Sequence, residues 1–96
     1  MSKGIEIIEF SGESCANCLT LMPILNKLAK KYDDVTLRHI ELDEKSKDII
    51  EKYEIDRVPT TMVLKDGKEI TRCRGFQPEE ILELWLDAKI EEARKM

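Results

Sequence analysis

The apolar residues of this chain alternate between short runs and stripes of helical spacing. Continuous or nearly continuous apolar runs are typical of buried strands. The small polar stretch Ser11–Ser14 predicts a loop after the first run, and Asp66–Gly67 predicts a tight hairpin, because this pair favours positive backbone angles. The predicted strands are Ile5–Phe10, Val35–Leu42, Thr60–Leu64 and Glu69–Cys73.

Apolar residues that recur every three or four positions predict helices in the remaining stretches. The short helix is expected at Asp43–Tyr53, and the last helix opens at Gln77–Pro78, where proline suits the first turn. The apolar stripe of the first helix, which starts near Cys18, is predicted at Leu21, Met22, Leu25, Leu28, Ala29 and Tyr32. The stripe of the last helix is predicted at Ile81, Leu84, Trp85 and Ala88.

The order of the elements is therefore strand, helix, strand, helix, strand, strand, helix. The first three elements form a unit that crosses over right-handedly into a parallel pair of strands, and the hairpin adds an antiparallel edge. We expect an α/β fold, with a mixed four-stranded sheet between helices in a three-layer α/β/α sandwich. With 96 residues, of which 42% are hydrophobic, the chain is long enough for a single domain over residues 1–96.

The charge pattern narrows the possible partners. The formal net charge is −4, and lysines and arginines are scattered among acidic residues, so binding to nucleic acid through a broad basic face is not expected. No run is long enough to span a bilayer, and the N-terminus lacks the apolar run of a signal peptide. We expect a cytoplasmic, monomeric protein that does not bind a membrane.

Two cysteines, Cys15 and Cys18, stand two residues apart in sequence at the predicted junction of a strand and a helix. The first turn of a helix presents unpaired N–H groups and a positive partial charge, and both favour a thiolate on Cys15. A thiolate is the nucleophile in disulfide exchange. Cys15, at or before the first turn, is expected to attack, and Cys18, further inward, to release the captured partner.

Three different interpretations of the cysteines stay open at this point. The pair could be two buried apolar residues or a passive structural disulfide, although an odd total of three cysteines argues against a disulfide-rich secreted fold. A zinc site would need four ligands, which Cys15, Cys18, Cys73 and His39 could supply. No second Cys-x-x-Cys is present, so we expect no metal.

Several residues along the chain resemble the thioredoxin family. Glu9–Phe10 ends the first strand, Cys15 follows six residues after the acid, and Pro23 lies five residues after Cys18. The resemblance extends over nearly the whole chain, through Asp56–Thr60, the Asp66–Gly67 hairpin and Gly75. It implies a thioredoxin-like fold, with Pro23 kinking the helix that carries the cysteines.

The resemblance also implies roles for particular residues. Glu9 matches the family's buried acid, which exchanges a proton with the resolving cysteine; the alternative is a carboxylate that points to solvent at the strand end. The bond between Val58 and Pro59 is implied to be cis, and the Val58 backbone to hold an extended peptide near Cys15. Gly75 and Ser14 match further positions of the docking surface.

The chain also departs from the family pattern. Ser14-Cys15-Ala16-Asn17-Cys18 stands where the family usually has tryptophan-cysteine-glycine-proline-cysteine, and Leu19 replaces a lysine. His39 stands where a lysine often accompanies the buried acid, so it is either structural or a neighbour of Glu9 on a proton path. Only four residues precede the first strand, which predicts a core closer in size to that of the glutaredoxins.

The expected function is reduction of disulfides in partner proteins by a dithiol of thioredoxin type, without a cofactor of its own. The implied partners are a thioredoxin reductase and proteins that contain disulfides. A second hypothesis is a glutaredoxin-like oxidoreductase linked to glutathione, for which Arg57 could bind a carboxylate, although the C-terminal glycine-glycine-acid signature of glutaredoxins is missing. A metal-binding module and an interaction module with an incidental disulfide are the third and fourth hypotheses.

Overall fold

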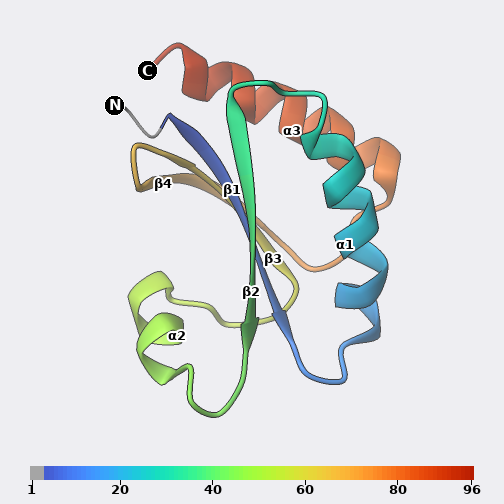
Figure 1. Ribbon diagram of the computed structural model, residues 1–96, viewed down its shortest axis with the longest axis vertical. Coiled ribbons are helices and arrows are strands. Elements are labelled where there is room, and N and C mark those ends of the chain that lie inside the picture. Colours follow the sequence, from blue (N-terminus) through green and yellow to red (C-terminus); the bar gives the residue numbers. More distant parts are fainter. Residues whose placement is uncertain (1–3) are drawn as a thin grey trace.

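The structure is a computed structural model that describes residues 4–96. The order of helices and strands is the predicted one (Figure 1). In chain order the elements are β1 (Ile5–Gly12), α1 (Ala16–Ala29), β2 (Val35–Leu42), α2 (Lys47–Tyr53), β3 (Thr60–Lys65), β4 (Lys68–Arg74) and α3 (Glu79–Arg94).

The described strands form one mixed sheet in the order β2-β1-β3-β4. Strand β1 pairs in parallel with β2 and antiparallel with β3, and β3 pairs antiparallel with β4 through the predicted hairpin. Asp66 and Gly67 have φ values of 52° and 86°, the positive angles that this turn requires. Helices α1 and α3 lie on one face of the sheet and α2 on the other, which confirms the three-layer α/β/α fold (Figure 1).

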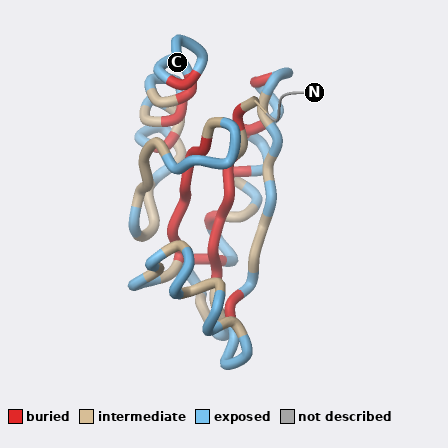
Figure 2. Tube along the Cα trace, turned by 90° about the vertical axis from the view of Figure 1, so that its left-hand side faces the viewer, coloured by how far each residue is buried: buried red, intermediate tan, exposed pale blue. Residues whose placement is uncertain are grey.

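Alternating side chains of β1 divide the core into two layers. Ile5 and Ile7 pack against α1 and α3, whereas Ile8 and Phe10 pack on the side of α2. The two inner strands are buried along most of their length (Figure 2). Glu9 shares the face of Ile5 and Ile7, so its side chain is enclosed between the sheet and the layer of α1.

The structure corrects two predicted boundaries. Strand β1 continues through Ser11, which is buried, to Gly12, so the predicted loop shrinks to a short turn before Cys15. Helix α2 begins at Lys47 and not at Asp43, because Asp43 accepts hydrogen bonds from the Lys45 backbone and the Ser46 hydroxyl and forms a turn of its own.

The predicted stripe of the last helix was wrong. Ile81 and Leu84 are exposed, Ala88 also faces solvent, and Trp85 is only partly buried at the edge of the core. The apolar stripe that packs on the sheet is shifted by one residue from the predicted stripe, and both sets of positions have helical spacing. Its residues are Leu82, Leu86, Ile90 and Ala93. The first helix follows its prediction except at Met22, which is half-buried, and at Tyr32, which is buried but lies beyond the helix end at Ala29.

Helix α1 continues without interruption past Pro23, which is exposed. None of the helices in residues 4–96 has the length and apolar character that a membrane span requires.

Candidate active site

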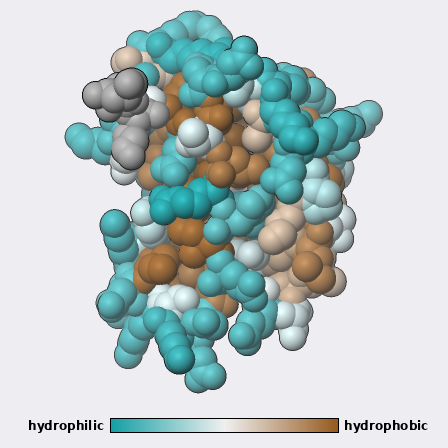
Figure 3. All heavy atoms as spheres, in the orientation of Figure 1, coloured by the Kyte–Doolittle hydropathy of each residue, from teal (hydrophilic) through white to brown (hydrophobic). Residues whose placement is uncertain are grey.

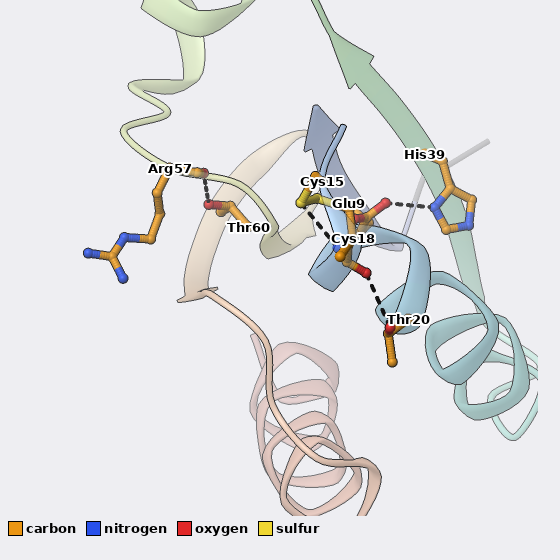
Figure 4. Close-up of a disulfide and its surroundings, with 8 residues drawn as sticks. Glu9, Cys15, Cys18, Thr20, His39, Arg57 and Thr60 are labelled. Carbon is orange, nitrogen blue, oxygen red and sulfur yellow. Dashed lines mark hydrogen bonds and ion pairs between the residues drawn. A yellow bond between two sulfur atoms is a disulfide. The ribbon is translucent and has the colours of Figure 1, made fainter. Parts of the chain in front are cut away.

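The two cysteines of the motif are joined by a disulfide at the start of α1 (Figure 4). Cys15 is the N-cap residue of the helix and is partly exposed, whereas Cys18 lies in the first turn and is 2% exposed. The backbone N–H of Cys18 donates a hydrogen bond to Cys15 Sγ over 3.1 Å. This N–H would also stabilise a thiolate on Cys15 after reduction.

The surroundings of Cys15 favour negative charge on its sulfur. The first turn of α1 carries no acidic residue that would oppose the positive end of the helix dipole. Ser14, at φ 55°, forms the turn that leads into the helix and is exposed. The disulfide borders a small hollow of about 120 Å³ that is also lined by Ser14, Leu19 and Met22.

The surface beside the disulfide includes an exposed apolar side chain. Leu19, directly after Cys18, is 71% exposed. Apolar atoms gather over the N-terminal part of α1 in the space-filling view (Figure 3). A partner docked over Cys15 would therefore meet an uncharged side chain at the position where the family usually has a lysine.

Glu9 is fully buried on the face of the sheet that α1 covers. Its neighbours in register are His39 on β2 and Thr61 on β3. Glu9 Oε1 lies 3.0 Å from His39 Nδ1, and Oε2 has no hydrogen-bond partner among residues 4–96. Burial raises the pKa of the Glu9 carboxyl, although the hydrogen bond and the charge of His39 partly oppose this rise. The solvent-exposed alternative for Glu9 is thus excluded.

The Val58–Pro59 bond is cis, as the resemblance implies. The Thr60 hydroxyl donates to the Arg57 carbonyl oxygen over 2.7 Å, and the Gly75 N–H donates to the Pro59 carbonyl oxygen over 2.7 Å. These bonds fasten the loop to the start of β3 and the end of β4. Gly75 has φ 89°, a conformation that glycine adopts readily.

Gly12 connects the loop to the disulfide. It lines the hollow of Cys15 and Cys18 and also a second hollow of about 280 Å³ beside Val58. A Cβ atom added at Gly12 would lie 3.1 Å from Val58 Cγ2, so glycine lets the loop approach β1 closely. The cysteines and the proline loop therefore lie at the same end of the sheet, as the sequence predicts.

The four ligands of the hypothetical zinc site are not brought together. Cys15 and Cys18 are bonded to each other, and His39 contacts Glu9 and Asn26. Within residues 4–96 no three His, Cys, Asp or Glu side chains are grouped so that they could hold a metal ion. Cys73, partly buried on β4 opposite Thr61, is a free thiol, and burial raises its pKa.

Two residues near the site were missed by sequence reasoning. Asn26 Oδ1 lies 3.1 Å from His39 Nε2, and Gly12 lines a hollow together with Val58 of the proline loop. The sequence holds a signal for Gly12, since a glycine at a strand end often marks close approach of two backbones. Asn26 has no comparable signal, because a polar residue on a helix usually faces solvent.

Comparison with known proteins agrees with this geometry. The family described as Thioredoxin matches residues 1–88. Thioredoxin from Chlamydia pneumoniae is 38% identical over 82 residues, which are 85% of this chain and 79% of that protein. A mutant thioredoxin from Halobacterium salinarum superimposes with a TM-score of 0.78 at 25% identity, covering 88% of this chain and 74% of the other.

Thioredoxin f2, in a crystal structure with ferredoxin:thioredoxin reductase, superimposes with a TM-score of 0.79 at 23% identity and covers 92% of this chain and 80% of that chain. This last likeness concerns the fold alone. Family match, relatives and the paired cysteines agree: the chain belongs to the thioredoxin family and is a thiol–disulfide oxidoreductase.

Proposed function

We propose that Cys15 captures disulfides of partner proteins and that Cys18 releases them in reduced form. The Cys15 thiolate attacks one sulfur of the partner's disulfide; a Cys15–partner bond forms and the partner's other sulfur leaves as a thiolate. Cys18 loses its proton and attacks Cys15 Sγ, so the second partner sulfur leaves and the Cys15–Cys18 bond forms. The partner gains two electrons and the dithiol loses two.

The difference in exposure between the two sulfurs is the observation that carries this assignment. Cys15 is partly exposed at the helix N-cap and accepts an N–H bond, whereas Cys18 is 2% exposed behind it. Only the Cys15 sulfur is accessible to a partner protein, and only the Cys18 sulfur lies where it can displace that partner from Cys15. The roles of nucleophile and resolving thiol follow from this asymmetry.

Glu9 is the proposed proton acceptor for Cys18. Its carboxyl group is buried on the face of the sheet covered by α1, where Cys18 occupies the first turn, and Oε2 is free of protein partners within the described residues. An acid whose pKa is raised by burial accepts and returns a proton closer to neutral pH than an exposed carboxylate does.

The proposed binding site for the partner's chain lies beside the proline loop. Val58 precedes Thr60, the first paired residue of β3, so its backbone lies outside the sheet ladder. An extended segment could add to this backbone as a short strand, between Ser14 on one side and Gly75 on the other. Pro59 has no N–H and itself accepts the bond from Gly75.

For the partners we propose proteins that contain disulfides and a flavin-dependent thioredoxin reductase, which would return two electrons to Cys15 and Cys18. Membership of the thioredoxin family supports both. We also propose that the protein acts as a monomer in the cytoplasm, where the net direction of exchange is reduction.

The test is capture of a partner by single-cysteine variants. Reduced protein carrying Cys18→Ser is mixed with a disulfide-bonded protein such as insulin, and linked species are mapped by mass spectrometry. Cys73→Ser is included in every variant so that only the motif can react. Cys18→Ser should accumulate a disulfide through Cys15, and Cys15→Ser should not. Equal capture by both variants would contradict the assigned roles.

A further inference from the structure

A chain of polar contacts leads from the buried carboxyl group of Glu9 to the surface. Glu9 Oε1 lies 3.0 Å from His39 Nδ1, and His39 Nε2 lies 3.1 Å from Asn26 Oδ1. The exposed fraction is zero for the Glu9 side chain and 27% for that of His39, and Asn26 is exposed. In the view of Figure 4 the Glu9 carboxyl group lies between the disulfide and His39.

The contacts determine where protons can lie. Because Asn26 Oδ1 accepts, His39 Nε2 carries a hydrogen. The short contact between Oε1 and Nδ1 then requires one shared proton, held either by the carboxyl group or by the ring. Oε2 is the one buried carboxyl oxygen in residues 4–96 without a partner. Such a pair can take up a proton at Oε2 while passing another to the ring.

The disulfide side of Glu9 is the side that a docked partner would cover. The hollow at Cys15 and Cys18 is also lined by Ser14, a residue of the proposed docking surface. Asn26, by contrast, lines a separate hollow of about 440 Å³ with Lys30 and Leu37, beside β2. A proton released during the resolving step therefore needs an exit away from the docked partner, and His39 and Asn26 lie along such an exit.

We propose that His39 is the exit of a proton relay that serves Cys18 through Glu9, opening to solvent beside Asn26 and away from the docked partner. The inference rests on the proposed role of Glu9. His39 acts through Glu9, and an imidazole ring suits this position because each of its two nitrogens can hold or release a hydrogen.

Each proton in the relay is accounted for. As Cys18 gives its proton to Glu9 Oε2, the proton on Oε1 passes to His39 Nδ1, and the proton on Nε2 leaves to solvent. The Cys18 thiolate attacks Cys15 Sγ, and the partner's sulfur departs with the electron pair of the broken bond. When a reductase reduces the disulfide, Cys18 regains a proton by the reverse sequence, and this resets the relay.

The other polar and titratable groups that face Glu9 and His39 do not provide a second path for the proton. On β2, Glu41 lies two residues beyond His39 on the same face and is exposed. Helix α1 contributes Cys18 and, near Asn26, Lys30. Strand β3 contributes Thr61, which does not titrate, and β4 places Cys73 opposite Thr61. Of these groups and His39, only His39 has a direct contact to the Glu9 carboxyl group.

The test compares His39→Gln and His39→Leu with the parent protein. Glutamine keeps an N–H that can hydrogen-bond to Oε1 but carries no exchangeable ring proton, whereas leucine removes both. Arg38→Gln is the matched control, because Arg38 is the neighbouring β2 residue, points to the opposite face and pairs with Glu6. Thermal unfolding of the oxidised proteins establishes that each variant is folded.

The assay is a single turnover of the reduced full chain, with Cys73→Ser in every protein, using an aromatic disulfide reagent whose thiol absorbs light. The rate of the first thiol release reports capture by Cys15 and depends on the reagent concentration. The rate of the second release reports resolution by Cys18 and does not depend on that concentration. Both are followed over a range of pH, and the carboxyl carbon of Glu9 is titrated by NMR in the same proteins.

Both His39 variants should slow the second release on the order of tenfold at neutral pH, with the first release unchanged. In His39→Leu the NMR midpoint of Glu9 should also move to higher pH, because His39 opposes the effect of burial. Asn26→Ala, a surface change, should slow the second release in the same direction.

The relay would be overturned if His39→Gln released the second thiol at the rate of the parent protein. It would also be overturned if the pH profile of that rate were unchanged in both variants. That result would leave the proposed function intact as long as Cys18→Ser still captures a partner through Cys15. Loss of that capture would instead refute the proposed function.

Discussion

Replacing Glu9 with glutamine should make the protein more stable at neutral pH. A raised pKa means that the folded chain holds a proton at pH values where the unfolded chain has lost it. The free energy of unfolding therefore falls as pH rises from the ordinary carboxyl value of 4.5 toward the raised value. The slope in this window is about 1.4 kcal/mol for each pH unit. At pH values above this window the free energy of unfolding stays lower by the full amount.

The size of the effect follows from the cost of charging a buried carboxyl group. Glu9 is fully buried and only Oε1 has a contact, with His39. Each pH unit by which burial raises the pKa of Glu9 lowers the stability of the parent at neutral pH by about 1.4 kcal/mol. Glutamine keeps the shape and the contact with His39 but never becomes charged. At neutral pH we expect a gain of this order, or roughly 4–8 °C in Tm per kcal/mol for a domain of this size.

Urea unfolding of the oxidised proteins between about pH 4 and pH 8 measures the effect. The difference between Glu9→Gln and the parent should be small at the acidic end and grow as pH rises. Glu13→Gln is the control, because Glu13 is exposed in the turn before Ser14. Parallel curves for Glu9→Gln and the parent would refute the reasoning, since they would mean that Glu9 loses its proton equally in both states.

Two further predictions concern the core and the third cysteine. Leu86→Ala should destabilise the protein by about 2–5 kcal/mol because Leu86 is fully buried, whereas Leu84→Ala should change the stability little. Equal losses of stability for the two variants in urea unfolding would contradict the burial of Leu86 in place of Leu84. In the reduced protein at neutral pH, Cys73 should react with iodoacetamide more slowly than Cys15, because burial raises the pKa of its thiol. Mass spectrometry of the alkylated peptides compares the two rates, and faster alkylation of Cys73 would contradict this.

Local signals in the sequence account for most of the fold. The Asp66–Gly67 hairpin and the strand Val35–Leu42 follow from turn chemistry and apolar runs, and the structure confirms both. The stripe of the last helix was wrong because Leu84 and Leu86 both satisfy a helical period. Only the position of α3 against the sheet decides which of the two is buried.

The site was predictable where its chemistry depends on neighbours in sequence. The motif and its position at the start of a helix place Cys15 outside and Cys18 inside, and the structure agrees. The contact between His39 and Asn26 depends on how α1 lies across β2, and no local pattern contains that information. The resemblance implied the cis bond before Pro59, which the residues alone did not.

The central claim is that Cys15 and Cys18 form a reversible dithiol–disulfide couple. A redox titration of the whole chain against defined dithiol–disulfide buffers, with mass-spectrometric mapping of all thiols, tests it most directly. The account predicts one two-electron transition in which Cys15 and Cys18 become linked while Cys73 stays free. A pair that never reduces and reoxidises reversibly, or a transition that joins Cys73 to either partner, would contradict it.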